Sequence, residues 1–113
     1  MAISELYTNS ATISTAIYSL PNNSTTPAAI TTDGIIQVFI QVSGLQANDE
    51  YKIQILEKVA ATQRVKYEVQ LVGPRFDLLW VSPALILMSG WDVTMLKIAG
   101  TDRTIAWSIR SVA

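Results

Sequence analysis

The chain has several short stretches in which apolar and polar residues alternate, the period of a β-strand with one buried face. The alternation is regular at 50–58 and at 64–72, where every second residue from Val65 to Leu71 is apolar and is expected to face the core. Only a short connection separates these two stretches, so we predict an antiparallel hairpin. A third stretch, 35–43, alternates in the same way from Ile36 to Val42.

Five other apolar stretches predict further strands, separated by turn signals rich in Gly, Pro, Asn, Ser and Thr. They cover residues 11–20, 77–81, 84–88, 91–98 and 103–112. The last two flank a short turn, so we predict a closing hairpin with Trp91 and Trp107 in the core. About eight short strands and no helical pattern predict an all-β fold, an antiparallel β-sandwich or a jelly-roll-like barrel.

The length of 113 residues fits one domain. We assign residues 11–113 to a single β-sandwich domain. Residues 1–10 are expected to form an N-terminal arm, because Leu6 and Tyr7 have no clear strand partner nearby. The stretch 21–34 is expected to be a loop.

Composition suggests that the protein does not work alone. Charged residues make up 15% of the chain and hydrophobic residues 50%, whereas an ordinary soluble domain has about 25% charged residues. The core of one small domain takes part of this apolar area, and we expect the rest to be buried against other chains in a homo-oligomer. The net charge of −1 gives no basic surface for nucleic acid, and no apolar run is long enough to span a membrane. We expect neither as a partner.

The sequence offers little for catalysis. It contains no Cys and no His, which removes the thiolate nucleophile, the usual general base near neutral pH and the commonest metal ligand. Asp33, Asp49 and Asp102 stand beside turn residues, where Asp commonly bonds the backbone. Phosphate-binding and nucleophile-elbow motifs do not occur in the sequence. We therefore expect no enzyme, no cofactor and no metal site.

Three segments, which together cover most of the chain, read MAISELYTNSATIS, YSLPNNSTTPAAITTDGIIQVFIQVSGL and GWDVTMLKIAGTDRTIAWSIR. Their most specific parts are Ser-Leu-Pro-Asn at 19–22 and Gly-Thr-Asp-Arg at 100–103. These segments resemble small virion structural proteins of tailed double-stranded DNA bacteriophages. The resemblance implies a head decoration, or cement, protein: a β-rich trimer that binds and stabilises the lattice of the major capsid protein. It also implies a location on the capsid surface of the virion, with assembly in the host cytoplasm.

Two alternatives stay open: a tail, baseplate or fibre protein, and a carbohydrate-binding β-sandwich module. Exposed aromatic rings on a flat face would favour the sugar binder, and apolar faces buried in an oligomer would favour a virion protein. Candidate contact residues lie in the arm, in the loop that follows residue 20 and around residue 80. They are Leu6, Tyr7, Pro21, Asn22, Asn23, Pro27, Phe76 and Trp80.

Overall fold

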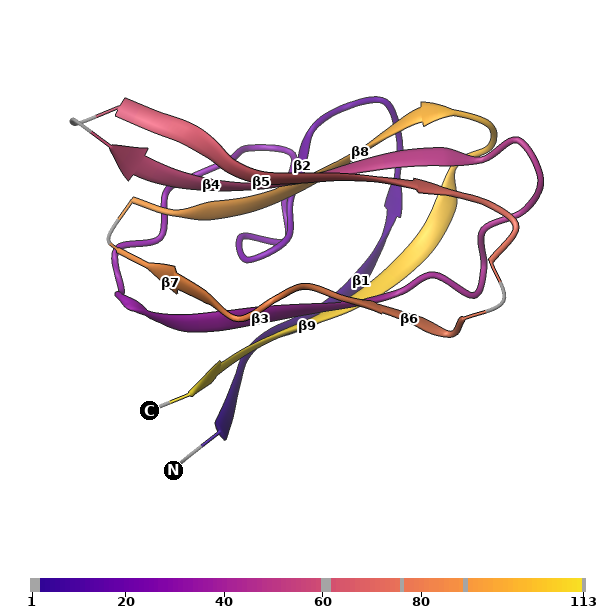
Figure 1. Ribbon diagram of the computed structural model, residues 1–113. Helices are drawn as coiled ribbons and strands as arrows, with labels where there is room; N and C mark the ends of the chain where they lie inside the picture. The colour runs from indigo at the N-terminus through magenta and orange to yellow at the C-terminus, as the bar shows by residue number, and fades with distance from the viewer. Residues whose placement is uncertain (1–2, 60–61, 76, 89, 113) are drawn as a thin grey trace.

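The computed structural model describes residues 3–59, 62–75, 77–88 and 90–112, and it is an all-β sandwich of two antiparallel sheets (Figure 1). The five-stranded sheet consists of β1 (Ile3–Ile13), β9 (Arg103–Val112) and β3 (Gly34–Gln41), with β6 (Leu79–Val81) and β7 (Leu85–Leu87) both paired to β3. The four-stranded sheet has the order β2 (Tyr18–Ser19), β8 (Asp92–Ala99), β4 (Glu50–Val59) and β5 (Thr62–Val72). None of the described residues is helical, so none of them forms a membrane-spanning helix.

The core lies between the two sheets and is filled by alternate residues of their strands. The prediction that Trp91 and Trp107 belong to the core is confirmed, since both side chains are buried. Each indole meets a tyrosine ring edge to face, with ring centroids 6.2 Å apart for Tyr7 and Trp91 and 5.9 Å apart for Tyr18 and Trp107. These contacts connect the edge strands β1 and β2 to the core.

The hairpin predicted from the alternation between residues 50 and 72 is confirmed, because β4 and β5 pair antiparallel along their length. A register shift between Ile55 and Leu56 changes the face of the sheet on which Val65 lies. Val65 lies beyond this shift and is 48% exposed, although the alternation assigns it to the core. One extra residue in a strand turns the following side chains to the opposite face of the sheet.

The closing stretch is not a hairpin, contrary to the prediction. β8 pairs with β2 and β4 in one sheet, whereas β9 pairs with β1 and β3 in the other. The turn between them therefore carries the chain across the sandwich. In a hairpin the buried side chains of both strands would share one face of one sheet; here Met95 and Trp107 belong to opposite layers of the same core.

A buried carboxylate fastens this crossing turn. Asp49 accepts hydrogen bonds from the backbone N–H of Thr101 at 3.0 Å and from Nε of Arg103 at 2.7 Å. The hydrogen bond from Arg103 is the main cause that lowers the pKa of Asp49 to about 2. Gly100 has a φ of 93°, and a Cβ there would stand 2.3 Å from Oδ1 of Asp49. The turn thus needs glycine at this position for two separate reasons.

Residues 3–10, which we expected to form an arm outside the sandwich, lie in β1 instead. β1 pairs antiparallel with β9, from Ile3 opposite Val112 to Ile13 opposite Arg103, with a register shift between Glu5 and the next paired residue. The partner strand is distant in sequence, so the local pattern gives no sign of it. The single strand predicted at 11–20 is also divided, because β1 ends at Ile13 and β2 starts anew in the other sheet.

Candidate interaction surface

The outer face of the five-stranded sheet carries a row of apolar side chains that crosses four strands. The register places Ile3 of β1 opposite Val112 of β9, Val112 opposite Ile35 of β3, and Ile35 opposite Ile86 of β7. Opposite residues share a face of the sheet, and the buried neighbour Ile36 shows that this face is the outer one. Ile3 and Ile86 are 68% and 70% exposed. The row is therefore an apolar surface in contact with water.

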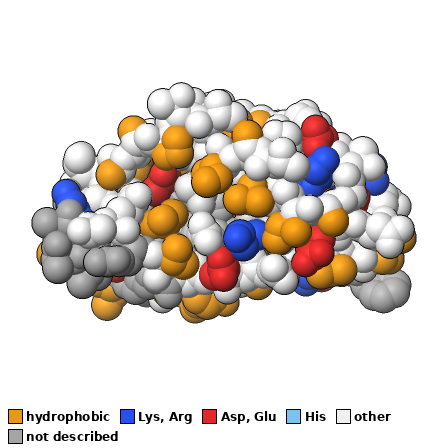
Figure 2. Space-filling model, turned by 90° about the horizontal axis from the view of Figure 1, so that it is seen from above, with side chains coloured by type: hydrophobic (Ala, Val, Ile, Leu, Met, Phe, Trp, Pro, Cys, Tyr) orange, Lys and Arg blue, Asp and Glu red, His pale blue; other side chains and the backbone are white. Residues whose placement is uncertain are grey.

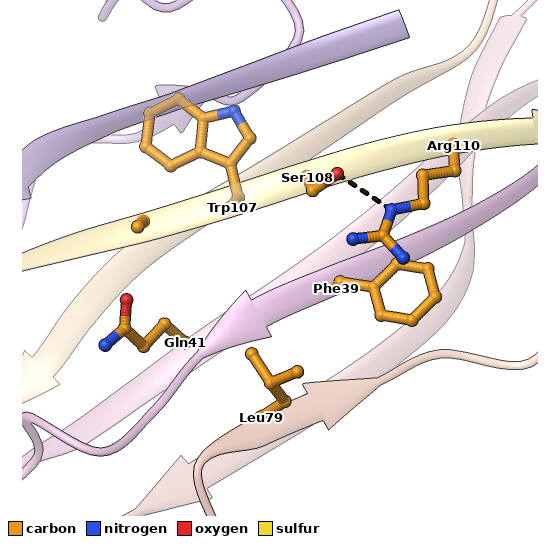
Figure 3. A pocket seen from close by; sticks show the side chains of 7 residues that line it. Phe39, Gln41, Leu79, Trp107, Ser108 and Arg110 are labelled. Carbon is orange, nitrogen blue, oxygen red and sulfur yellow. Dashed lines mark hydrogen bonds between the residues drawn. The ribbon is translucent and has the colours of Figure 1, made fainter. Parts of the chain in front are cut away.

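A second apolar cluster lies farther along β3 on the same outer face. Val81 of β6 stands opposite Phe39, and Leu79 stands opposite Gln41. Leu78, just before β6, is 71% exposed. A hollow of about 170 Å³ lies beside this cluster (Figure 3). The outer face thus has two apolar regions.

The charged side chain of Arg110 lies between these two regions. The guanidinium carbon of Arg110 lies 4.1 Å from the centroid of the Phe39 ring, a cation–π contact that Figure 3 shows. Nε of Arg110 donates a hydrogen bond to Oγ of Ser108 at 3.1 Å, and Ser108 donates to Glu5. The ring and the hydroxyl group thus hold this arginine against the sheet.

The outer face of the four-stranded sheet has a different character. Nζ of Lys52 lies 3.8 Å from Oε1 of Glu68, and Nε2 of Gln54 donates a hydrogen bond to the same oxygen at 2.6 Å. Figure 2, seen from this side of the sandwich, shows charged side chains of both signs among hydrophobic ones. We therefore take the outer face of the five-stranded sheet as the candidate interaction surface.

A second hollow, of about 250 Å³, opens between β1 and the loop that follows β2. The structure brings four of the predicted contact residues together there: Leu6, Tyr7, Pro21 and Asn23. Trp107 forms part of the wall, and its indole Nε1 is, among the described residues, a buried donor without a hydrogen-bond partner. Pockets for drug-sized ligands have about 300–1,000 Å³, so this hollow fits a side chain or a few water molecules better than a whole ligand.

Three of the other predicted contact residues, Asn22, Pro27 and Trp80, are not part of the wall of this hollow. Nδ2 of Asn22 donates two hydrogen bonds of 2.7 Å within the chain, which hold the loop against β2. Pro27 is exposed in the same loop. Trp80 is half-buried and stacks on Tyr67 of the other sheet, with ring centroids 6.4 Å apart, so it contributes to the core. Phe76 lies outside the described residues.

Sequence reasoning missed the outer face itself. Its signal was present in the stretch 35–43, where Ile35 and Phe39 fall on the side opposite the buried residues, among glutamines. An apolar residue on the polar side of an alternating strand is a sign of a contact surface. How far the surface extends depends on which strands lie beside β3, and the local pattern does not contain that information.

Comparison of the chain with family models, with curated proteins and with solved structures finds no match in any of the three. A functional proposal therefore starts from the surface and from the sequence resemblance described above.

Two buried carboxylates, Asp49 and Asp92, form hydrogen bonds within the fold. None of the described His, Cys, Asp and Glu residues gather in threes as a metal ion requires. Asp92 is buried at the start of β8, and its Oδ1 accepts hydrogen bonds from Oγ of Ser19 at 2.7 Å and from the N–H of Val93 at 2.8 Å. Burial raises the pKa of Asp92, and the hydrogen bond from Ser19 opposes that rise. This pair joins β8 to β2.

Proposed function

We propose that this protein is a structural subunit without enzymatic activity, and that it binds other protein chains through the outer face of its five-stranded sheet. The observation that carries the proposal is the apolar row from Ile3 to Ile86 together with the cluster around Phe39. Apolar side chains that gather on one exposed face beside polar residues commonly mark a site of contact with another protein. A surface of this kind is typical of a protein that functions in contact with a partner.

The size of the patch supports a contact of moderate strength. Full burial of a Leu or Ile side chain is worth about 1.5–3 kcal/mol at roughly 25 cal/mol per Å², which corresponds to roughly 60–120 Å² each. Six apolar side chains on and beside this face, each 41–71% exposed, contribute roughly 200–400 Å² of the approximately 800 Å² that one partner of a standard interface buries. The gross gain of roughly 5–10 kcal/mol is comparable to the cost of association, so one contact is modest. Many copies on a repeating lattice would bind far more tightly.

In its finer form we propose a head decoration protein, a homo-oligomer bound to the major capsid protein on the surface of a tailed bacteriophage virion. The resemblance of the three segments supports this role, and a lattice is a partner on which modest contacts add up. A tail, baseplate or fibre subunit would use the same surface on a different part of the particle.

A carbohydrate-binding function has less support. Sugar-binding faces present exposed aromatic rings, whereas the rings of Tyr7, Tyr18 and Tyr67 are each packed against a tryptophan. Phe39 is on the outer face, but the guanidinium of Arg110 covers its ring. These four aromatic rings are thus packed against other side chains of the protein.

Matched lysine substitutions on the two outer faces test the proposal. Val81→Lys changes the candidate surface at a residue that is 43% exposed, and Val65→Lys changes the opposite sheet at a residue that is 48% exposed. Purified variants are added to capsids that were assembled without this protein, and bound protein is measured after sedimentation. We expect Val81→Lys to bind at least tenfold more weakly than wild type and Val65→Lys to bind normally. Equal binding of both variants would show that the outer face of the five-stranded sheet is not the contact surface. No binding by the wild-type protein would show that the capsid is not its partner.

A further inference from the structure

The free edges of the two sheets differ in how well they are protected against pairing with another chain. Among the described residues, β1 and β5 are the long edge strands, each of 11 residues, while β2, β6 and β7 have only two or three. Short strands and charged residues are the usual ways to block an edge. β5 carries Arg64, Lys66 and Glu68, whereas β1 carries only Glu5. Beyond its bulge, β1 therefore has an unprotected edge from Tyr7 to Ile13.

The hydrogen bonds of β1 show which backbone groups face this edge. The N–H of Ser10 donates to Oδ1 of its neighbour Asn9 at 2.8 Å, so it does not point at β9. Along an antiparallel strand, the N–H and C=O groups of successive residues point to opposite sides. Thr8, Ser10 and Thr12 consequently direct their N–H and C=O groups away from β9, in the plane of the sheet. A strand laid along β1 would meet regularly spaced donors and acceptors once the N–H of Ser10 exchanges Oδ1 of Asn9 for a carbonyl oxygen of that strand.

We propose that β1 pairs with β1 of a second copy of this chain, antiparallel and about a two-fold axis at Ser10. In this register Ser10 stands opposite Ser10 of the partner subunit, and Thr8 stands opposite Thr12 of the partner subunit. Both are pairs of residues whose N–H and C=O groups face the edge, as a hydrogen-bonded antiparallel pair requires.

The side chains also complement one another in this register. Thr8 stands opposite Thr12 of the partner subunit, and both side chains are exposed in the free chain, so they can form a favourable cross-strand pair on each side of the axis. Tyr7 stands opposite Ile13 of the partner subunit, but these side chains belong to the cores of their own subunits. Glu5 lies outside the paired span, so the two negative charges do not meet. The contact joins two five-stranded sheets into one of ten strands.

The symmetry of this contact separates it from other modes of association. An isologous contact uses the same strand of both subunits and closes as a dimer, not as the trimer that the resemblance implies. It also does not depend on the outer face, so it can hold whether or not the protein binds a capsid.

Disulfide cross-linking tests the register, because the chain has no cysteine of its own. Opposite residues in a hydrogen-bonded pair have Cα atoms about 5.5 Å apart, within the range of a disulfide. We expect Ser10→Cys to give a covalent dimer under mild oxidation. The double variant with Thr8→Cys and Thr12→Cys should cross-link as well, whereas either single variant should not. Gln70→Cys on the edge of β5 is the control and should stay monomeric on a denaturing gel.

Sedimentation equilibrium tests the dimer itself. Ser10→Pro removes the outward N–H and leaves the bonds to β9 intact, since proline is tolerated on a strand edge. We expect wild type and Ser10→Ala to sediment as dimers, and Ser10→Pro to dissociate at least tenfold more readily with an unchanged circular dichroism spectrum. A wild-type monomer or trimer would overturn the proposal. If Ser10→Pro fails to fold, the cysteine variants test the proposal instead. Failure of Ser10→Cys to form the covalent dimer would then overturn it.

Discussion

Replacing Trp107 by alanine should remove a large part of the stability of the fold. The side chain is 3% exposed, and it lies on the central strand β9 between β1 and β3. Its ring packs edge to face against Tyr18, with centroids 5.9 Å apart. Trp→Ala substitutions in cores cost about 3–5 kcal/mol, because transfer energy is lost and a cavity remains. A domain of this size is stable by about 5–15 kcal/mol in total, so the variant is expected to be only marginally folded.

The buried area gives a similar magnitude by a separate route. An aromatic side chain buries about 150–250 Å², which at roughly 25 cal/mol per Å² amounts to about 4–6 kcal/mol as an upper estimate. Alanine retains a small part of this, and loss of the ring pair with Tyr18 adds about 0.5–1.5 kcal/mol. Because the area figure is an upper estimate, it is consistent with a loss of about 3–5 kcal/mol for Trp107→Ala.

Equilibrium urea unfolding, followed by far-ultraviolet circular dichroism at a fixed protein concentration, measures this loss. Trp107→Phe is the control, because it keeps a ring and deletes an indole N–H that has no hydrogen-bond partner. Removal of the unsatisfied donor offsets part of the stability that the smaller ring loses, so we expect Trp107→Phe to cost less than about 1.5 kcal/mol. A loss under about 1 kcal/mol for Trp107→Ala would refute the core assignment. Equal losses for both variants would refute the reasoning about the donor.

Three further substitutions test the polar groups and the crossing turn. Asp49→Asn should cost about 1–2 kcal/mol at pH 7 in urea unfolding, since the folded pKa of Asp49, about 2, lies below the unfolded value of 3.8. Its contribution is full above pH 4 and disappears as the pH falls through 2, so a variant as stable as wild type at pH 7 would contradict it. Gly100→Ala should cost about 2–3 kcal/mol in thermal unfolding, because of its positive φ and the nearby Asp49 oxygen; an unchanged melting temperature would argue against this. The free energy of unfolding of Asp92→Asn should increase relative to that of wild type as the pH rises above about 4, because the folded state resists ionisation of Asp92. A pH-independent difference between the two proteins would show that Asp92 does not titrate abnormally.

The strands themselves could be predicted because alternation is a local property. The stretches that became β3, β4, β5 and β9 each had a clear buried face in the sequence. β1 was missed because an edge strand needs few apolar residues, and six of its residues, including Thr8 and Ser10, are exposed and not aliphatic or aromatic. Pairing was the weaker prediction, since Gly100 marks a turn equally well whether the chain folds back in one sheet or crosses to the other.

For the contact residues too, the sequence predicted what is local and missed what depends on the order of the strands. Leu6, Tyr7, Pro21 and Asn23 were predicted from local composition, and the structure brings them together at one hollow. The apolar row on the outer face joins four strands that are distant in sequence. No window of the sequence contains that row, so only the strand order reveals it.

The pairing of β1 with β9 has a consequence for the speed of folding. Thr8 and Trp107, which share a hydrogen bond across these strands, are 99 positions apart in the chain. The hairpin of β4 and β5 closes locally and can form within about 1–10 μs, whereas sandwiches dominated by distant pairings fold in about milliseconds to seconds. During synthesis, β1 and β3 leave the ribosome long before the strand that lies between them. For that interval both strands have an open place for a wrong neighbour, which makes the time before β9 docks the period of greatest risk for aggregation.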